Sequence, residues 1–434
     1  MVSAILIIIV FIILCVLMIM KKISALIAMP LMAFFIALIS GLFSGLPFFG
    51  EKGKCVADFI FVDVISKGSF RLAEAMMYAG FGAILSRVVM TTGVAEKLVK
   101  TAAELAGDKK FVVALILTVA SAIVFGSVSG LGGFIMIASL VLPVMTASGI
   151  SAPLSACLLL FSLSIGGIFN PANWGFYKDA LGIDLEVVKN FSISYAIILS
   201  VVALIFLIFE LRREKRVVFW AVKVDETENK LSPFALITPI LPIILIINPL
   251  YSVPVVPAFI ISALYGAMVS DLKNTINTIT SSIIEGLKDI APVFGLFIGI
   301  GMLLNAVSAP YVTSIMQPLL KSVVPSNPVW FIVFFFLLSP LALYRGPFNL
   351  YGLGSGLAAV LVSSNILPAP AVMGAFLSVG QIQGICDPTN TQNVWIAQYM
   401  KVSVEDLMKK TIPYVLGFVL ISLIWAVVFG GILK

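Results

Sequence analysis

A 22-residue segment of the 434-residue chain occurs twice, with the second copy 217 positions after the first. Residues 152–173 read APLSACLLLFSLSIGGIFNPAN, and residues 369–390 read APAVMGAFLSVGQIQGICDPTN, with eight identities and no gap. Each copy is an apolar helix that runs into a Pro and Asn cluster. A helix cannot continue there, because proline lacks an amide donor and clashes with the preceding turn. The repeat therefore predicts two related halves, each with an interrupted apolar helix.

The composition is that of a polytopic membrane protein. Hydrophobic residues make up 61% of the chain and charged residues 11%, whereas soluble domains are about half apolar and about a quarter charged. Apolar runs repeatedly reach the roughly 20 residues that a helix needs to cross the hydrocarbon. The first run, from Val2, has neither the basic start nor the cleavage site of a signal peptide, so we expect it to be the first spanning helix.

Several classes of site and partner do not fit this sequence. The four cysteines, Cys15, Cys55, Cys157 and Cys386, form no CxxC pair, so neither a disulfide framework nor a zinc site is expected. The chain has no histidine, so any coupled proton must be carried by carboxylates. The net charge of +6 comes from basic residues in short loops, which the positive-inside rule explains, and we expect no nucleic-acid partner.

Apolar runs predict four simple spans in each half, at residues 2–20, 24–46, 72–93 and 191–209, and at residues 233–249, 252–270, 286–308 and 411–431. Residues 94–107 and 309–324 fit helices that lie in the membrane interface. Residues 111–147 and 327–364 each form two apolar segments around a glycine-rich bend, GSVSGLGG and RGPFNLYGLGSG. Such a bend is either a turn between two full spans or the tip of a re-entrant hairpin.

The distribution of basic residues favours re-entrant hairpins. Each half then has five spans, counting the broken helix as one, and the odd number makes the two halves inverted. One face holds seventeen Lys and Arg and the other holds eight, so the first is predicted to be cytoplasmic. This places both termini on the non-cytoplasmic side and makes residues 212–232 a cytoplasmic linker between the halves, residues 1–211 and 233–434.

The two helix breaks carry the candidate chemistry, because interrupted helices at matching positions indicate a transporter binding site. Asn170 and Asn173 in the first break align with Asp387 and Asn390 in the second, where Thr389 and Thr391 add hydroxyls. Helix N-termini there attract anions, and C-terminal carbonyls can hold cations. A carboxylate at membrane depth is costly, so Asp387 is expected to couple an ion, a proton or a sodium ion near Asn170; the alternative is that it only caps a helix.

The glycine-rich bends supply the remaining candidates for substrate binding. Arg345 can hold a substrate carboxylate with two parallel hydrogen bonds, or it can reach lipid headgroups or the carbonyl ends of its hairpin. Asn349 lies further along that bend, and Ser127 and Ser129 are the hydroxyls of the first bend.

The chain resembles the ion transporter superfamily, most nearly its citrate-metal symporter and gluconate permease branches. The resemblance rests on MKKISALIAMPLMAFFIALISG, GSVSGLGGFIMIASLVLPVM and NPANWGFYKDALGID. It implies an all-α fold of two inverted five-helix repeats, a homodimer built on scaffold elements (1–93 and 233–308), and elevator-like movement of transport elements (111–190 and 327–400). SVSGLGG stands where the citrate-metal branch carries aspartates and threonines, which argues against a metal-citrate cargo.

We therefore expect a secondary active transporter of a small organic anion, a carboxylate or hydroxycarboxylate, in the cell membrane. It is expected to use no cofactor and to catalyse no covalent reaction. A sodium/proton antiporter of the same architecture is the first alternative, and an anion channel is the second. An intramembrane enzyme is the least expected alternative, because the sequence contains no paired catalytic motif.

Overall fold

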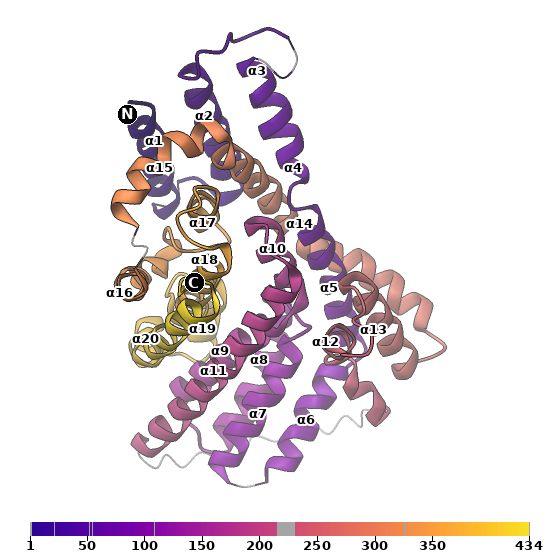
Figure 1. The fold of residues 1–434 in the computed structure, drawn as a ribbon. Coiled ribbons are helices and arrows are strands. Elements are labelled where there is room, and N and C mark those ends of the chain that lie inside the picture. The colour runs from indigo at the N-terminus through magenta and orange to yellow at the C-terminus, as the bar shows by residue number, and fades with distance from the viewer. Residues whose placement is uncertain are drawn as a thin grey trace.

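The described structure is helical throughout and contains no strand (Figure 1). It is a computed structural model that describes residues 2–20, 22–51, 53, 55–107, 109–214, 231–324 and 327–433. Within these ranges, eight helices are long and apolar enough to cross a membrane, or nine if the bent pair Pro310–Val323 and Pro328–Tyr344 is one span. The chain is thus a multi-pass membrane protein, as its composition predicts.

The first half contains two long helices, a composite helix, an amphipathic helix, a hairpin, a broken helix and a final long helix. In order these are α1 (Val2–Ile19), α2 (Ala25–Leu42), α3 (Val56–Asp58), the π-helix η1 (Phe59–Lys67), α4 (Gly68–Phe70), α5 (Ala73–Thr91), α6 (Val94–Ala106), α7 (Lys110–Phe125), α8 (Gly130–Ala147), α9 (Ala152–Phe169), α10 (Pro171–Leu181) and α11 (Leu185–Arg213).

The second half follows a similar order. Its elements are the 3₁₀ helix η2 (Pro233–Ile237), α12 (Leu241–Ile247), α13 (Val255–Ser270), α14 (Thr275–Ser308), α15 (Pro310–Val323), α16 (Pro328–Leu338), the 3₁₀ helix η3 (Ser339–Arg345), α17 (Leu353–Ser363), α18 (Ala369–Cys386), α19 (Thr391–Tyr399) and α20 (Val404–Phe429). Both breaks therefore fall where the repeat predicts them, between α9 and α10 and between α18 and α19.

Four expected boundaries were wrong. Residues 233–249 are not one span, because Pro233, Pro239 and Pro242 divide them into η2 and α12. Helix α14 begins at Thr275 rather than near residue 286, because its polar first turns do not register as an apolar run. Helical segments from Val56 to Phe70 precede α5, where a loop was expected. Helix α11 extends to Arg213, into the expected linker, whose residues 215–230 lie outside the described part of the chain.

Helix α14 packs against α2 and against the segment from η1 to α5, and these contacts join the two halves. Glycines allow the backbones to approach closely: a Cβ atom on Gly301 would lie 2.3 Å from the carbonyl oxygen of Gly68. Arg87 of α5 donates to both carboxylate oxygens of Asp289 in α14, at 2.5 and 2.6 Å. Arg87 is therefore a structural link between the halves.

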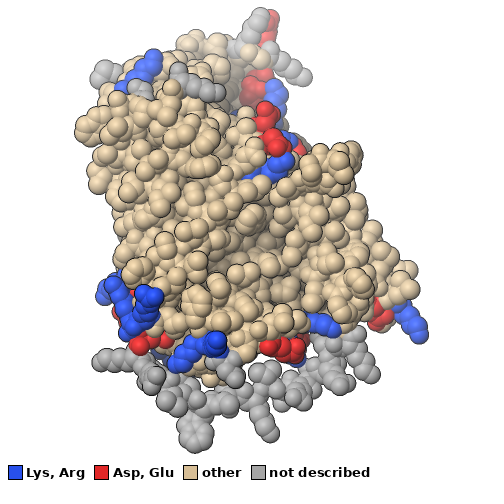
Figure 2. Space-filling model, turned by 60° about the horizontal axis from the view of Figure 1, so that its bottom comes forward, with Lys and Arg blue, Asp and Glu red and all other residues tan. Residues whose placement is uncertain are grey.

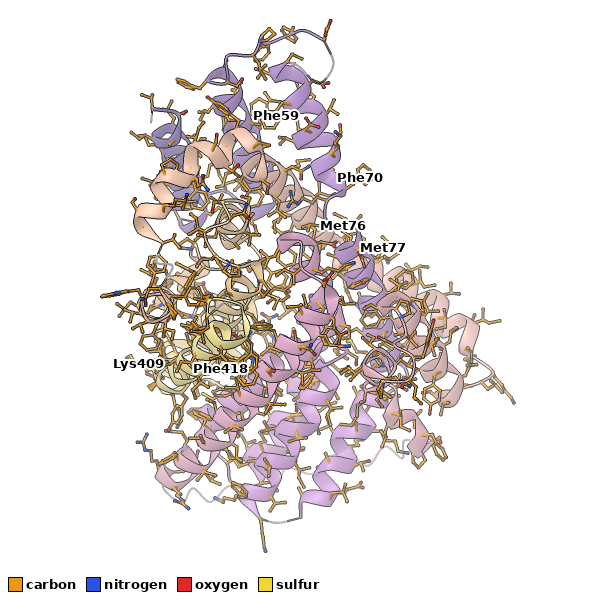
Figure 3. The ribbon with its side chains drawn as sticks, viewed as in Figure 1. Phe59, Phe70, Met76, Met77, Lys409 and Phe418 are labelled. Carbon is orange, nitrogen blue, oxygen red and sulfur yellow. The ribbon has the colours of Figure 1, made fainter. Side chains whose placement is uncertain are left out.

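Charged side chains gather toward two opposite edges of the face seen in Figure 2, and a band of uncharged residues separates them. This distribution suits a protein that spans a bilayer. Figure 3 shows Phe59, Phe70, Met76 and Met77 following one another along the composite helix from η1 to α5. Phe70 is 76% exposed, as is ordinary for an apolar side chain that faces lipid.

Candidate functional site

At the first break, polar side chains bind the interrupted backbone. Asn170, which is 2% exposed, accepts a hydrogen bond from the backbone N–H of Ala172 at 3.0 Å and so caps α10. The side-chain amide of Asn173 donates to the carbonyl of Gly167 at 2.7 Å, and the indole N–H of Trp174 donates to that of Ile168 at 2.9 Å. The buried end of α9 is thus satisfied by side chains of α10.

The second break is built in the same way. One carboxylate oxygen of Asp387 accepts from the backbone N–H of Thr389 at 2.8 Å and from its hydroxyl at 2.7 Å. The amide of Asn390 donates to the carbonyl of Gln383 at 3.1 Å. The amide of Asn393 donates to the carbonyls of Ile385 and Asp387 at 3.2 and 3.0 Å.

The two breaks differ chiefly in one charge. Asn170 and Asp387 each accept a bond from the backbone N–H two residues on, so an uncharged side chain is sufficient for the cap. Asp387 is fully buried, and burial of a carboxylate is costly unless its charge serves a partner. Among the described residues, no group of three or more His, Cys, Asp and Glu gathers as a multidentate metal site would.

The first hairpin, α7 and α8, contributes a helix N-terminus to this region. Ser129 stands at the N-cap of α8 without a side-chain cap bond in the described structure, and its backbone N–H donates to Ser86 of α5 at 3.3 Å. Ser127 is fully buried and donates to the carbonyl of Val124 at 3.3 Å. A helix N-terminus whose amides no side chain caps is suited to binding an anion.

The second hairpin has a longer and more irregular tip. Asn349, 9% exposed, accepts from the backbone N–H of Tyr351 at 3.0 Å, and its own carbonyl accepts from Gly354 at 2.8 Å. Tyr344 adopts a left-handed conformation, with φ of 57°, which is unusual for a bulky residue and common at functional sites. The side chain of Arg345 lies outside the described part of the structure.

Contacts between elements bring the breaks and the hairpins together. The broken helices α9 and α18 pack against each other, and a Cβ atom on Gly384 would lie 2.8 Å from the hydroxyl oxygen of Ser164. Helix α8 meets α19 through Phe134 and Trp395, whose ring centroids are 5.9 Å apart. Phe176 of α10 stacks on Tyr351 at 4.7 Å. Each hairpin thus lies against the post-break helix of the other half.

Not every candidate residue lies inside this assembly, and two contributors were missed. Thr391, at the first position of α19, is exposed. Trp174 was not among the expected site residues; it is fully buried and binds the end of α9. Asn393, which donates to two carbonyls at the second break, was also not among the expected site residues. Its place three residues after Asn390, on the same face of a helix, is the signal that could have identified it.

A cavity of about 340 Å³ lies close to the breaks but is chemically unsuited to an anion. Its lining comes from α7, α9, α11 and the segment of η2 and α12, and is almost entirely aliphatic, with Thr118 and Ser200 as its hydroxyl residues. Both hydroxyls donate to carbonyls of their own helices, at 2.6 and 2.7 Å. The polar groups of the breaks and hairpins are therefore the better candidate site.

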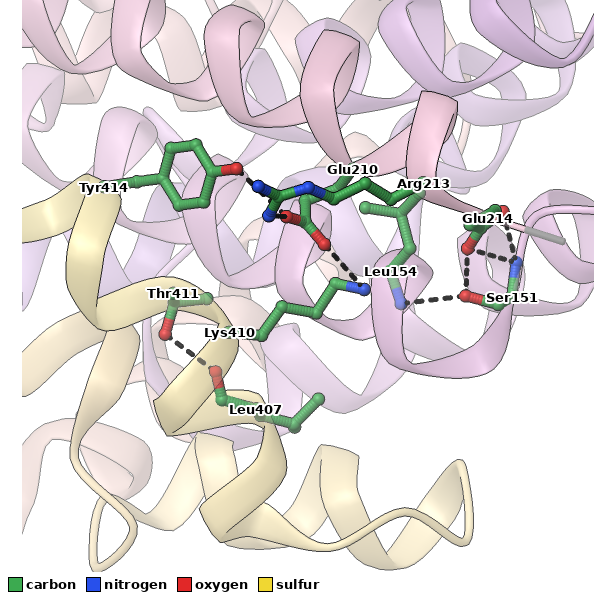
Figure 4. Close-up of polar contacts among 9 residues, drawn as sticks. All are labelled: Ser151, Leu154, Glu210, Arg213, Glu214, Leu407, Lys410, Thr411 and Tyr414. Carbon is green, nitrogen blue, oxygen red and sulfur yellow. Dashed lines mark hydrogen bonds and ion pairs between the residues drawn. The ribbon is translucent and has the colours of Figure 1, made fainter.

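A buried ion pair joins α11 to α20 (Figure 4). Glu210, whose side chain is 7% exposed, lies 2.9 Å from the ammonium of Lys410. It also accepts hydrogen bonds from Tyr414 and Arg213, both at 2.9 Å. This cluster connects the last helix of each half, and removing one partner would leave the other charge buried and only partly compensated.

Comparisons with known proteins show the fold. No protein-family model matches the chain, and no curated protein matches it. Among solved structures, the YdaH transporter of Alcanivorax borkumensis, described as having an unusual topology, has a TM-score of 0.66 at 13% identity, over 93% of this chain and 97% of that one. MtrF of Neisseria gonorrhoeae, described as illuminating a class of antimetabolite efflux pumps, has a TM-score of 0.57 at 14% identity, over 92% and 93%.

These neighbours share the overall helical architecture along nearly the whole chain. At such low identity the likeness concerns the fold alone. Neither neighbour is described as a citrate-metal symporter or a gluconate permease. The branch that the sequence resembles most nearly therefore stays a prediction.

Proposed function

We propose that this protein is a secondary active transporter, an ion-coupled symporter that carries a small organic anion of the carboxylate or hydroxycarboxylate class across the cell membrane. The observation that carries the proposal is the pair of helix breaks, which have the same hydrogen-bonding plan but differ in charge at Asn170 and Asp387. One break supplies a carboxylate for the coupling cation. The N-terminus of α8 and the amides and hydroxyls at the breaks receive the anion.

We also propose that the halves are inverted repeats and that the protein works by an elevator mechanism. The similar order of elements in the halves, and the matched hydrogen bonds at the breaks, support a repeat, and an odd number of spans in each half would make it inverted. In this proposal residues 1–93 and 233–308 form a scaffold and a dimer interface. Residues 111–190 and 327–400 form the moving transport elements. Arg345, at the edge of the second hairpin, pairs with the substrate carboxylate.

Uptake into proteoliposomes tests this function. A panel of mono-, di- and hydroxycarboxylates is offered with an imposed sodium gradient, an imposed proton gradient or neither. Symport predicts that at least one anion accumulates above its equilibrium level with one of the gradients. Its concentration should return to equilibrium when an ionophore removes that gradient. Sodium/proton exchange without any anion would support an antiporter instead, and gradient-independent flux that never exceeds equilibrium would support a channel.

The likeness to MtrF favours export as a second candidate for the direction of transport. In that case the same coupling site drives an anionic antimetabolite out of the cell. Reversing the imposed gradient in the same proteoliposomes separates the two directions, because a symporter follows the ion whichever way it flows, whereas an antiporting pump moves its cargo against the ion.

A further inference from the structure

Helix α10 lies tightly against α5, with small residues along the contact. A Cβ atom on Gly175 would lie 3.1 Å from the Cα of Ala75, and one on Gly82 would lie 2.9 Å from the Cβ of Ala172. Such close approach of backbones is typical of stable helix pairs in membranes. In the proposed mechanism α5 belongs to the scaffold and α10 to the transport elements, so this contact lies between the two.

Charged groups close one end of the contact. Asp179 of α10 accepts a hydrogen bond from the backbone N–H of Ala75 at 2.9 Å. Leu72, at the N-cap of α5, has no side-chain cap bond, so the cap of α5 comes from another helix. Lys178 forms an ion pair with Glu74, which also accepts from Tyr78 at 2.5 Å.

Aromatic rings hold a neighbouring face of α10. Phe176 is fully buried and stacks between Phe297 of α14, at 5.1 Å, and Tyr351 of the second hairpin, at 4.7 Å. Helix α10 is therefore fixed between the scaffold and the hairpin in the arrangement that the structure shows.

The second half has no charged residues at the positions equivalent to Glu74, Lys178 and Asp179. With the offset of 217 positions that relates the repeats, Lys178 and Asp179 correspond to Trp395 and Ile396, and Glu74 corresponds to Ala291. Helix α19, with the sequence TQNVWIAQY, contains no charged residue. Inverted halves exchange their roles when a transporter changes sides, so the opposite arrangement would place α19 against α14 without these polar bonds.

We propose that Glu74, Lys178 and Asp179 form a one-sided latch that sets which of two arrangements the resting protein occupies. The proposal rests on the alternating mechanism proposed above. The latch stabilises only the arrangement with α10 on α5, and it opens in every transport cycle. Substrate and coupling ion shift the equilibrium against this bias.

The latch is tested by measuring the distance between two spin labels in lipid nanodiscs. The labels are attached at Phe70→Cys in α4 and at Lys401→Cys after α19, in a background without the four native cysteines. The unmodified latch predicts one dominant distance. Asp179→Ala should increase the minor population about fivefold, as loss of one helix cap implies, and Glu74→Gln about threefold for a half-exposed ion pair. The double reversal Glu74→Lys with Lys178→Glu should restore the original ratio of populations, which also shows that the variants are folded.

Lys67→Gln is the matched control, because the ion pair of Lys67 with Asp63 lies within one helical segment and Lys67 is 67% exposed. It should leave the populations unchanged. The latch would be refuted if two arrangements are observed but Asp179→Ala and Glu74→Gln keep the wild-type ratio of their populations. A single distance in every variant, with ligands and ions present, would refute the alternating mechanism itself, whereas failure of anion uptake with two distances would refute only the cargo.

Discussion

Asp387→Asn is expected to abolish coupling between ion and anion while the protein remains folded. Asparagine at position 387 keeps a side-chain oxygen for the backbone N–H of Thr389, because Asn170 makes the same bond in the first break. What the substitution removes is the negative charge. A charge-assisted contact contributes about 1.5–3 kcal/mol, so the affinity for the coupling ion should fall roughly 10- to 150-fold. Gradient-driven uptake in proteoliposomes measures this loss.

The control for Asp387→Asn is Glu405→Gln, the same kind of change at an exposed position in the first turn of α20. It should preserve uptake. Wild-type coupling in Asp387→Asn would mean that the residue serves only as a helix cap. Asp387→Ala, which removes both cap and charge, should also lower stability by about 1 kcal/mol.

Lys410→Met is expected to destabilise the protein by about 2–4 kcal/mol. Glu210 is almost fully buried, and loss of its ammonium partner leaves a buried carboxylate that is only partly compensated by Tyr414 and Arg213. Removing one partner of a fully buried pair typically costs about 3–5 kcal/mol, and the residual 25% exposure of Lys410 reduces that figure. Unfolding by denaturant in micelles, followed by tryptophan fluorescence, provides the measurement.

Arg213→Met removes a different positive charge from the same carboxylate and serves as the control. Arg213 is 70% exposed, so its loss should cost about 1 kcal/mol or less. Equal stability of Lys410→Met and Arg213→Met would contradict the view that Lys410 compensates the buried charge.

The sequence was sufficient for the interrupted helices, because their signal is local. Proline and asparagine at 170–173 and 387–390 end an apolar run, and one helix ends and the next begins there in the structure. Helix boundaries that lie among polar residues were harder to predict from the sequence. The first turns of α14 and the segment before α5 carry charge and hydroxyls, yet they are helical, because helix propensity and packing do not require an apolar sequence.

Contacts between residues of different helices could not be predicted from the sequence. Lys178 belongs to α10 and pairs with Glu74, 104 positions away. Asn393 and Trp174 satisfy helix ends, a role that depends on where a chain turns back on itself. Long-range partners of this kind follow from tertiary packing and leave no periodic trace in one sequence.

We expect the breaks and hairpins of both halves to enclose one hydrated site, and protection of thiols by substrate is the decisive test. Single cysteines at Ser129 and Thr389, which lie in opposite halves, are labelled with a water-soluble thiol reagent in a background without native cysteines. The transported anion should slow labelling at both positions, whereas a cysteine at Leu272, exposed in the loop before α14, should react at an unchanged rate. Protection in one half alone, or in neither, would rule out a site shared by the two halves.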